Sequence, residues 1–382
     1  MDIRITRAEL AEAVAWAARA LPGRTPVPVL GALLLTAEPG RLAVSGSDLE
    51  TSARAGADAE VAVAGRVLVP GRRLLDICRV LPDGPVSCVR EGNRLTVEAG
   101  GTRFGLSTLP YEEYPAPPAT PPVYGEVDAA AFATAVGQVA VAAGRDDTLP
   151  MLTGVQLRLE GEEMTLSASD RYRYAVRRLP WQPPAAGGRA GEAVEVLLPA
   201  RRLAEVARAL GRCGMLRLLL DPGAADGAGA VGFEGGLGGR STRALLRRLE
   251  GRLPGYGSLF ELAGAAVAGA ECGALAEAVR RVAVVADGHS PVRLDFSAAE
   301  DSLLVRAGYG DDVAAQRLPA VLRGAEEVSV AFNPAYLLDA LNSFEGPELR
   351  LELLGSGQRV LLGSGAGHSL HRHLLMSVKQ LV

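Results

Sequence analysis

The sequence predicts an α+β protein made of three tandem copies of one domain. Three observations support this fold class. Three segments share the spacing of a helix with one buried face, three others share a strand-to-helix pattern, and short strand-like segments lie between them. A chain of 382 residues is also long enough for two or three domains.

The first set consists of helical segments whose hydrophobic residues recur at i, i+4, i+7 and i+11. Its members are Leu10, Val14, Ala17 and Leu21, then Phe132, Val136, Val139 and Ala143, then Leu275, Val279, Val282 and Ala286. Thr6 and Glu9 form a capping-box pattern before the first helix, and Asp128 is an N-cap candidate for the second.

The second set begins at Pro70, Pro199 and Asn333, with the sequences PGRRLLDICRVL, PARRLAEVARAL and NPAYLLDALNSF. Three residue positions match across the set: Leu74, Leu203 and Leu337; Asp76, Glu205 and Asp339; Leu81, Leu210 and Phe344. Each member follows a hydrophobic run, so a strand is expected to lead into each helix.

Each repeat is therefore expected to run helix, strands, helix, strands over about 120 to 140 residues, which is an ordinary domain size. Domain boundaries are expected near the proline-rich YPAPPATPPVYG and at LPGYGSLFE. The three domains would span 1–124, 125–257 and 258–382.

Composition points to a soluble globular protein, with 48% hydrophobic and 22% charged residues. The formal net charge is −4, so any surface that binds nucleic acid must be locally positive. Four cysteines without a CxxC spacing argue against a disulfide framework or a zinc ribbon. The first ten residues do not resemble a signal peptide, and Glu271 and Glu277 interrupt the most hydrophobic window. A cytoplasmic protein without a membrane span is expected.

Signals of catalysis are weak. The GAGAVG segment from Gly227 to Gly232 matches GxGxxG but leads into FEGGLGG, where no helix is expected. His371 and His373 would share one strand face, and His368 lies nearby, so chelation is geometrically possible. No carboxylate or cysteine accompanies them, which favours surface histidines over a metal site. We therefore expect a protein without catalytic residues, cofactor or metal.

Two arginine pairs, Arg72 with Arg73 and Arg201 with Arg202, fall in the first turn of the second helix in repeats one and two. Cations at a helix N-terminus oppose the helix dipole, so local helix energetics would not select them. A binding site for a polyanion at the helix start would favour arginines there. The alternative is that the arginine pairs belong to a solvated basic face. The third repeat has NPAY in place of an arginine pair, so the pattern is incomplete.

A third candidate is the stretch SDRYRYAV, in which Ser169 and Asp170 indicate a turn after a strand. Tyr172 and Tyr174 alternate as residues on one strand face do. They could form a stacking platform for bases or an amphipathic strand with half-buried tyrosines. The pattern leaves both interpretations open.

Several longer segments resemble the bacterial DNA polymerase III β subunit family, the DNA sliding clamps. They are LPGRTPVPVLGALLL, VPGRRLLDICRVLP, RFGLSTLPYEEYP, SASDRYRYAVRRLPW and HRHLLMSVKQLV. The resemblance extends over the whole chain in order. It implies that the chain is half of a six-domain ring, which a head-to-tail homodimer forms around double-stranded DNA. It also implies that the ring binds DNA without sequence specificity and has no catalytic activity. By this resemblance Arg24, Arg72, Arg73, Arg201 and Arg202 are expected to approach the DNA.

The resemblance also implies a pocket for short hydrophobic peptides of the polymerase III alpha subunit, the clamp loader and other clamp-binding proteins. The matching positions are Leu152, Ser169, Arg171, Tyr172, Arg173, Tyr174, Pro254, Ser258, Leu259, His289, Asn333, Tyr336, Met376, Ser377 and Val378. Tyr174, Ser258 and Ser377 depart from the leucine, arginine and proline that are common in the family.

For the dimer contact, the resemblance points to the strand with Arg103, Phe104 and Leu106 and to the helix near Val284. Phe104 and Leu106 would share a strand face and form a hydrophobic patch that an isolated chain exposes.

Two other functional hypotheses remain. One is a divergent accessory clamp with altered partner or inhibitor binding at the pocket. The other is a repeat protein with a hydrolase or metal site around the terminal histidines.

Overall fold

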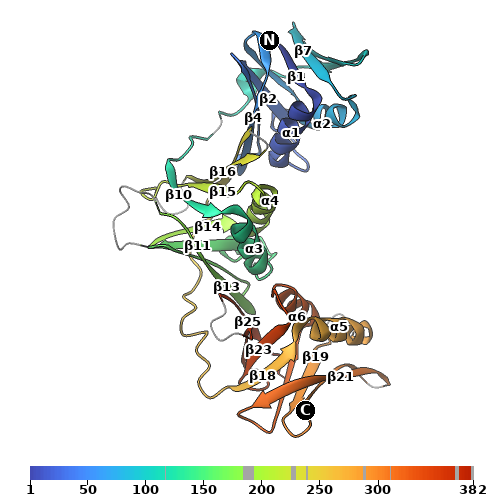
Figure 1. Ribbon diagram of the computed structural model, residues 1–382, viewed down its shortest axis with the longest axis vertical. Coiled ribbons are helices and arrows are strands. Elements are labelled where there is room, and N and C mark those ends of the chain that lie inside the picture. Colours follow the sequence, from blue (N-terminus) through green and yellow to red (C-terminus); the bar gives the residue numbers. More distant parts are fainter. Residues whose placement is uncertain are drawn as a thin grey trace. The chain divides into compact units, whose positions relative to one another are not determined.

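The computed structural model describes residues 1–116, 118–183, 193–224, 229–237, 240–286, 290–309, 311–365 and 370–379. The chain forms two compact units, and Figure 1 labels the helices and strands. The first consists mainly of Met1–Ala130 and Glu205–Arg248, and the second mainly of Ala131–Trp181 and Leu249–Val382. Gly227 and Ala228, which open the GAGAVG segment, lie outside the described residues, and Ala230 begins a strand, not a helix.

The prediction of two helices per repeat is confirmed. In the described residues the α-helices are α1 (Arg7–Ala17), α2 (Gly71–Val80), α3 (Ala129–Ala140), α4 (Ala200–Leu210), α5 (Cys272–Val282) and α6 (Pro334–Leu341). Short 3-10 helices are η1 (Ala18–Ala20), η2 (Pro28–Gly31), η3 (Tyr111–Glu113), η4 (Pro150–Thr153) and η5 (Ala283–Val285). None of these helices is long and hydrophobic enough to cross a membrane.

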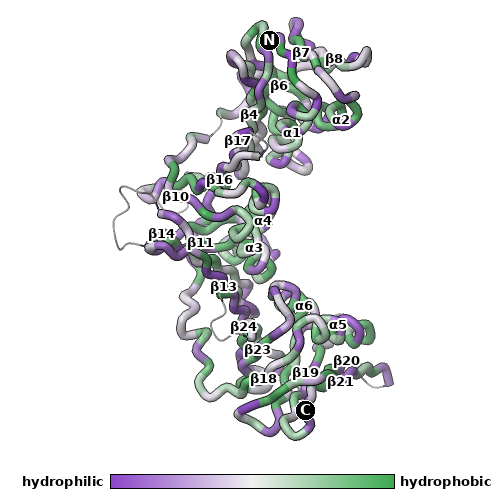
Figure 2. Tube along the Cα trace, viewed as in Figure 1, coloured by the Kyte–Doolittle hydropathy of each residue, from purple (hydrophilic) through white to green (hydrophobic). Residues whose placement is uncertain are grey.

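The helix patterns are buried as expected, although the helices are shorter than the patterns. Leu74, Leu203 and Leu337, which match across the repeats, are fully buried. The fourth position of each hydrophobic stripe, such as Leu21, lies beyond the helix end. Thr6 caps α1 by accepting a hydrogen bond from the Glu9 backbone N–H at 3.3 Å. Most of α3 is hydrophobic (Figure 2).

The first unit contains two antiparallel sheets. The five-stranded sheet has the order β5 (Glu60–Val63), β1 (Asp2–Thr6), β7 (Pro85–Glu91), β8 (Arg94–Ala99) and β9 (Thr102–Ser107). The eight-stranded sheet has the order β10 (Val123–Asp128), β15 (Met215–Leu219), β16 (Ala230–Leu237), β17 (Arg240–Arg247), β4 (Thr51–Asp58), β3 (Arg41–Ser47), β2 (Ala32–Glu38) and β6 (Gly65–Pro70). Pairing of β17 with β4 joins the second repeat to the first, with Ala244 opposite Ala53.

The second unit contains twelve strands in hydrogen-bonded order. They are β14 (Val194–Pro199), β11 (Gly154–Glu160), β12 (Glu163–Ser169), β13 (Arg173–Pro180), β25 (His371–Met376), β24 (Arg359–Ser364), β23 (Glu348–Leu353), β18 (Ala266–Glu271), β21 (Asp312–Arg323), β20 (Ser302–Tyr309), β19 (Val292–Ser297) and β22 (Glu327–Phe332). Here β13 pairs with β25, with Tyr174 opposite Leu374, so the second and third repeats share one sheet.

All four cysteines are free, and Cys78, Cys88 and Cys272 are buried. Burial raises the pKa of the Cys78 and Cys88 thiols to about 12, which keeps them protonated and unreactive.

Candidate functional sites

The turn between β12 and β13 is held by its own polar side chains. Ser169 Oγ donates to the Arg173 carbonyl at 2.8 Å, and Asp170 Oδ1 accepts from the backbone N–H groups of Tyr172 and Arg173. Arg171 has a φ of 80°, in the left-handed region. This tight turn presents Arg171 and Tyr172 to solvent while Arg173 and Tyr174 are buried.

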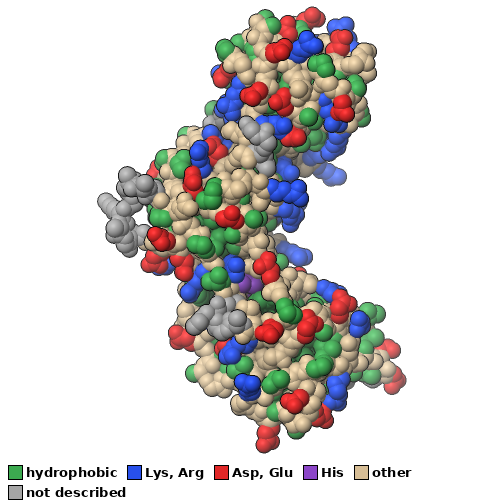
Figure 3. All heavy atoms as spheres, in the orientation of Figure 1, with side chains coloured by type: hydrophobic (Ala, Val, Ile, Leu, Met, Phe, Trp, Pro, Cys, Tyr) green, Lys and Arg blue, Asp and Glu red, His purple; other side chains and the backbone are tan. Residues whose placement is uncertain are grey.

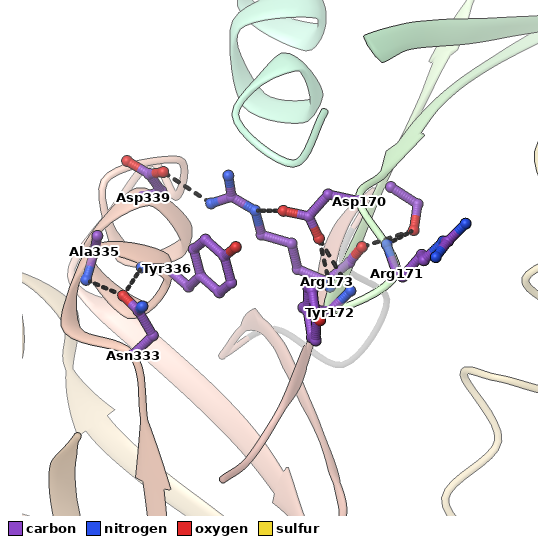
Figure 4. Close-up of polar contacts among 9 residues, drawn as sticks. Asp170, Arg171, Tyr172, Arg173, Asn333, Ala335, Tyr336 and Asp339 are labelled. Atoms are coloured by element: carbon purple, nitrogen blue, oxygen red, sulfur yellow. Dashed lines mark hydrogen bonds and ion pairs between the residues drawn. The ribbon is translucent and has the colours of Figure 1, made fainter. Parts of the chain in front are cut away.

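Arg173 joins the turn to α6 (Figure 4). Its guanidinium donates to Asp170 Oδ2 and to Asp339 Oδ2, both at 2.8 Å, although the side chain is only 4% exposed. It also stacks over the Tyr336 ring at 4.3 Å from the centroid. Two carboxylates and an aromatic face compensate for the cost of burying this charge.

A cavity of about 460 Å³ opens beside this ion pair. Its lining includes Leu149, Leu152, Arg171, Tyr172 and Tyr336. The Tyr172 and Tyr336 rings lie 6.3 Å apart, and Asn333 caps α6 by accepting from the Ala335 backbone N–H at 2.9 Å. The hollow combines aliphatic and aromatic walls with fixed polar groups, as sites for short peptides do.

The expected shared strand face of Tyr172 and Tyr174 is wrong. Tyr172 precedes β13 and is 61% exposed, whereas Tyr174 lies in the strand and is 4% exposed. The Tyr174 hydroxyl donates to the Pro254 carbonyl at 2.9 Å, and its ring meets the Phe260 ring edge-on at 5.9 Å. Burial raises the pKa of Tyr174 to about 12. The bend from β12 to β13 separates the two rings into different surroundings.

The segment between β17 and β18, called the connecting segment below, covers Tyr174. Tyr256 and Phe260 contact its ring, and Leu259 packs against the same hydrophobic cluster together with Leu361 and Leu374. Ser258 and Pro254 are exposed at the edge of this segment. The predicted pocket residues therefore form two neighbouring groups, one around Tyr172 and Tyr336 and one around Tyr174.

The C-terminal strand completes this region. The Met376 backbone N–H donates to the Tyr172 carbonyl at 2.8 Å, and the Val378 N–H donates to the Ala331 carbonyl at 2.7 Å. Met376 and Val378 are exposed, whereas Ser377 is buried and its hydroxyl donates to the Gln358 carbonyl at 2.8 Å. His289, the remaining predicted pocket residue, lies outside the described residues.

The expectation of surface histidines is also wrong. His371 and His373 are almost fully buried, and burial lowers the pKa of His371 to about 4 and that of His373 well below its usual value. His371 Nε2 lies 2.8 Å from Ser343 Oγ and its Nδ1 lies 3.2 Å from the Val176 carbonyl. No group of three or more potential metal ligands occurs in the described part of the chain. His368 lies outside the described residues.

The predicted DNA-contacting arginines lie at helix starts and in a nearby loop. Arg72 Nη2 donates to the carbonyls of Pro22 at 2.9 Å and Gly23 at 3.3 Å, next to the exposed Arg24, and Arg73 is exposed. In the other unit Arg201 is exposed and Arg202 half-buried in the first turn of α4. Figure 3 shows basic side chains gathered beside α2 and, separately, beside α4.

The predicted dimer residues are only partly available. β9 is an edge strand, and Arg103 is exposed on it. Leu106 is 4% exposed and Phe104 is half-buried, so the expectation that both are displayed is wrong for Leu106. The shared face of these two residues points largely into the domain. Val284, in η5, is 83% exposed.

Four residues of the site were missed from the sequence: Asp339, Tyr256, Phe260 and Leu374. Asp339 was recognised only as a repeated acidic position, and Tyr256 and Phe260 only as part of a boundary segment. Their role depends on long-range pairing of β13 with β25, which a local pattern does not contain.

Three α+β domains in tandem, each with two helices against antiparallel sheets, define the chain as a protein of the DNA-clamp fold. Models of the DNA polymerase III beta subunit match in order: the N-terminal domain at residues 1–118, the central domain at 126–253 and the C-terminal domain at 261–378. The chain belongs to this family, the beta sliding clamps.

Similar proteins agree over the full length. The chain is 45% identical to the beta sliding clamp of Streptomyces coelicolor and 37% identical to the beta sliding clamp homolog GriR of Streptomyces muensis, with 99% of each chain covered in both comparisons. The crystal structure of the DNA polymerase III subunit beta from Pseudomonas aeruginosa superposes with a TM-score of 0.89, at 25% identity and with full coverage of both chains.

Proposed function

We propose that this chain is a replicative DNA sliding clamp that closes with a second copy, head to tail, into a six-domain ring around double-stranded DNA. The observation that carries the proposal is the ordered match of three beta-clamp domains to three internal repeats. The ring has no catalytic role in this proposal. It keeps polymerase on DNA by encircling the duplex, and it acts in the cytoplasm, where the bacterial chromosome lies.

The arginines at the helix starts support sequence-independent contact with DNA. Arg73 lies in the first turn of α2 and Arg201 in the first turn of α4, one position apart when the two repeats are aligned. Contacts between arginine and phosphate carry no base information and allow sliding. Arg72 instead braces the loop that carries Arg24, which would position Arg24 toward the same phosphates.

The two pocket groups support capture of partner peptides. The cavity beside Tyr172 and Tyr336 provides an aromatic wall, and the exposed Met376 and Val378 add hydrophobic surface at the C-terminal strand. In this proposal the pocket holds short hydrophobic peptides of the DNA polymerase III alpha subunit, of the clamp loader and of other clamp-binding proteins.

An accessory clamp with altered partner or inhibitor binding is the second candidate. The 37% identity to the GriR homolog and the unusual Tyr174, Ser258 and Ser377 favour it. The 45% identity to the beta sliding clamp of Streptomyces coelicolor favours the replicative role. Peptides tiled across the same organism's alpha subunit distinguish the two, because a replicative clamp binds at least one of them.

The decisive experiment is primer extension on primed circular single-stranded DNA with the organism's own polymerase and clamp loader. Addition of the wild-type chain should lengthen the DNA that the polymerase synthesises each time it binds the primer. The double variant Arg73→Ala/Arg201→Ala should shorten them, while Arg323→Ala, an exposed arginine on β21, should not. Unchanged product length on addition of the wild-type chain would refute the proposal.

A further inference from the structure

A second cavity of about 270 Å³ lies beside the Tyr174 cluster, on the sheet face away from α6. Its lining comes from β13, β25, β24 and β23 and from the connecting segment with Tyr256 and Phe260. The face is identified by alternation along β25: His371 contacts Ser343, which follows α6, so Arg372 points the other way.

The register of the strands places a glycine between two arginines on this face. Arg372 pairs with Gly363, and Gly363 pairs with Arg350, so the three residues form one row across β25, β24 and β23. Strands are about 4.8 Å apart, so the two arginine backbones stand about 10 Å apart. The missing side chain at Gly363 leaves a hollow between them, and both arginines line it.

Positive charge dominates this hollow. Arg178, on β13, lines it as well, diagonally across from Arg372. Among the described residues of the lining, Glu352 is the one carboxylate, against three guanidinium groups. The lining therefore carries a net positive charge, which would attract an anionic group.

Each guanidinium is oriented by one or two neighbours and keeps further donors. Arg372 Nη2 donates to the Phe260 carbonyl at 3.2 Å and stacks on the Phe260 ring. Arg178 Nη2 donates to the Tyr256 hydroxyl at 3.3 Å, with Glu163 at 3.8 Å from its Nε, and Arg350 Nε donates to Glu352 at 3.4 Å. A guanidinium has five N–H donors, so most remain available to an anion.

From this arrangement we propose that the cavity binds the carboxylate side chains of an acidic peptide segment, next to the hydrophobic part of a partner held at the pocket. Tyr256 and Phe260 contact Tyr174 and also line the cavity, so the cavity adjoins the Tyr174 group of the predicted pocket residues. This inference rests on the proposed function for the hydrophobic part of the partner. It adds a specificity element, in which acidic flanking residues are selected over neutral or basic ones.

An acidic peptide fits this site better than nucleic acid does. The cavity lies on the opposite sheet face from α6, whereas the arginines proposed for DNA occupy helix starts. Its small volume and its position beside the Tyr174 group suit an extended peptide carrying a few carboxylates.

The test measures peptide affinity by fluorescence anisotropy. The tightest peptide from the tiled alpha subunit is extended at either end by four glutamates or by four glutamines. When the extension is at the end that reaches the cavity, the glutamate form should bind the wild-type chain about 5- to 30-fold more tightly than the glutamine form in 50 mM salt. This gain in affinity should shrink in 0.5 M salt. The double variant Arg350→Gln/Arg372→Gln should lose the gain and still bind the unextended peptide. The control variant Arg323→Gln, at an arginine on the same sheet face but outside the cavity, should keep the gain in affinity of the glutamate form.

A second probe separates this inference from the peptide-pocket proposal. Labelled hexaglutamate, which has no hydrophobic residues, should bind weakly to the wild-type chain and to Tyr172→Ala, but not to Arg350→Gln/Arg372→Gln. If no tiled peptide binds but hexaglutamate behaves this way, the peptide pocket fails and the anion site stands. Equal affinity of the glutamate and glutamine forms overturns the inference. The inference is also overturned if a hexathymidine oligonucleotide binds through Arg350 and Arg372 and hexaglutamate does not bind.

Discussion

Arg173 and Asp339 are joined by a 2.8 Å ion pair that connects β13 of the second repeat to α6 of the third. The arginine is 4% exposed and also pairs with Asp170. A buried cation with two carboxylate partners both fixes the turn at residues 169–174 and holds the floor of the candidate peptide pocket.

Replacing this arginine should therefore destabilise the fold. Arg173→Ala leaves the Asp170 carboxylate, whose side chain is only 10% exposed, without its counter-ion, and we expect a loss of about 3 kcal/mol in the free energy of unfolding. Urea unfolding followed by circular dichroism measures the effect. Arg79→Ala is the matched control, because its pair with Asp76 is about two-thirds exposed and should contribute less than about 0.5 kcal/mol. Equal losses in the two variants would contradict the prediction.

Acid should weaken the protein through its buried histidines. The pKa of His371 is lowered to about 4 from 6.5, so the folded chain keeps this ring neutral while the unfolded chain protonates it. Its stabilising contribution is present above pH 6.5 and is lost as the pH falls toward 4, up to about 3 kcal/mol.

His373, whose pKa burial also lowers well below its usual value, adds to the same loss. Thermal unfolding between pH 7 and pH 5, above most carboxylate titrations, measures the change. His373→Phe should reduce the slope of Tm against pH, because it removes one group that takes up a proton on unfolding. An unchanged slope would show that burial of His373 does not contribute.

DNA contact should depend on Arg73 in a characteristic way. Removing one arginine–phosphate contact lowers the slope of log K against log salt by about 0.9. Arg73→Ala should show this change for each copy of Arg73 in the ring that contacts a short duplex, without a change in Tm. Arg72→Ala should also alter protection of the Pro22–Gly23 loop from proteolysis, because Arg72 donates to both carbonyls. A salt slope unchanged in Arg73→Ala would exclude this residue from the DNA contact.

Dimer formation should depend on Val284 more than on Leu106. Val284 is 83% exposed, whereas Leu106 is already buried within its own domain. Val284→Glu should shift the protein from dimer to monomer at micromolar concentration, as measured by light scattering, with little change in Tm. Val80→Glu, at a valine that is 68% exposed on α2, should remain dimeric. A dimeric Val284→Glu would place the contact elsewhere.

Much of the fold could be predicted because its signals are local. The matched positions of Leu74, Leu203 and Leu337 identified three equivalent helices, and all three residues are buried. The N-cap at Thr6 was confirmed for the same reason, since a helix start depends on a few adjacent residues. The expected domain boundaries remain predictions.

The errors occurred where burial depends on distant segments. Alternation placed Tyr172 with Tyr174 and put Leu106 on an exposed face, but a turn and a packed domain core determine their exposure. His371 and His373 were expected at the surface because nothing nearby in sequence covers them; β13 and the residues after α6 do.

The sequence by itself determined the repeats, the helices with their buried faces and the family of this protein, because each is written in residue spacing or in contiguous segments. Only the tertiary structure decided that Arg173 meets Asp339, that Tyr174 is enclosed by the connecting segment, and that Arg372 and Arg350 flank Gly363. The physical reason is that strand register brings together residues far apart in the chain, and no local pattern specifies which strands will pair.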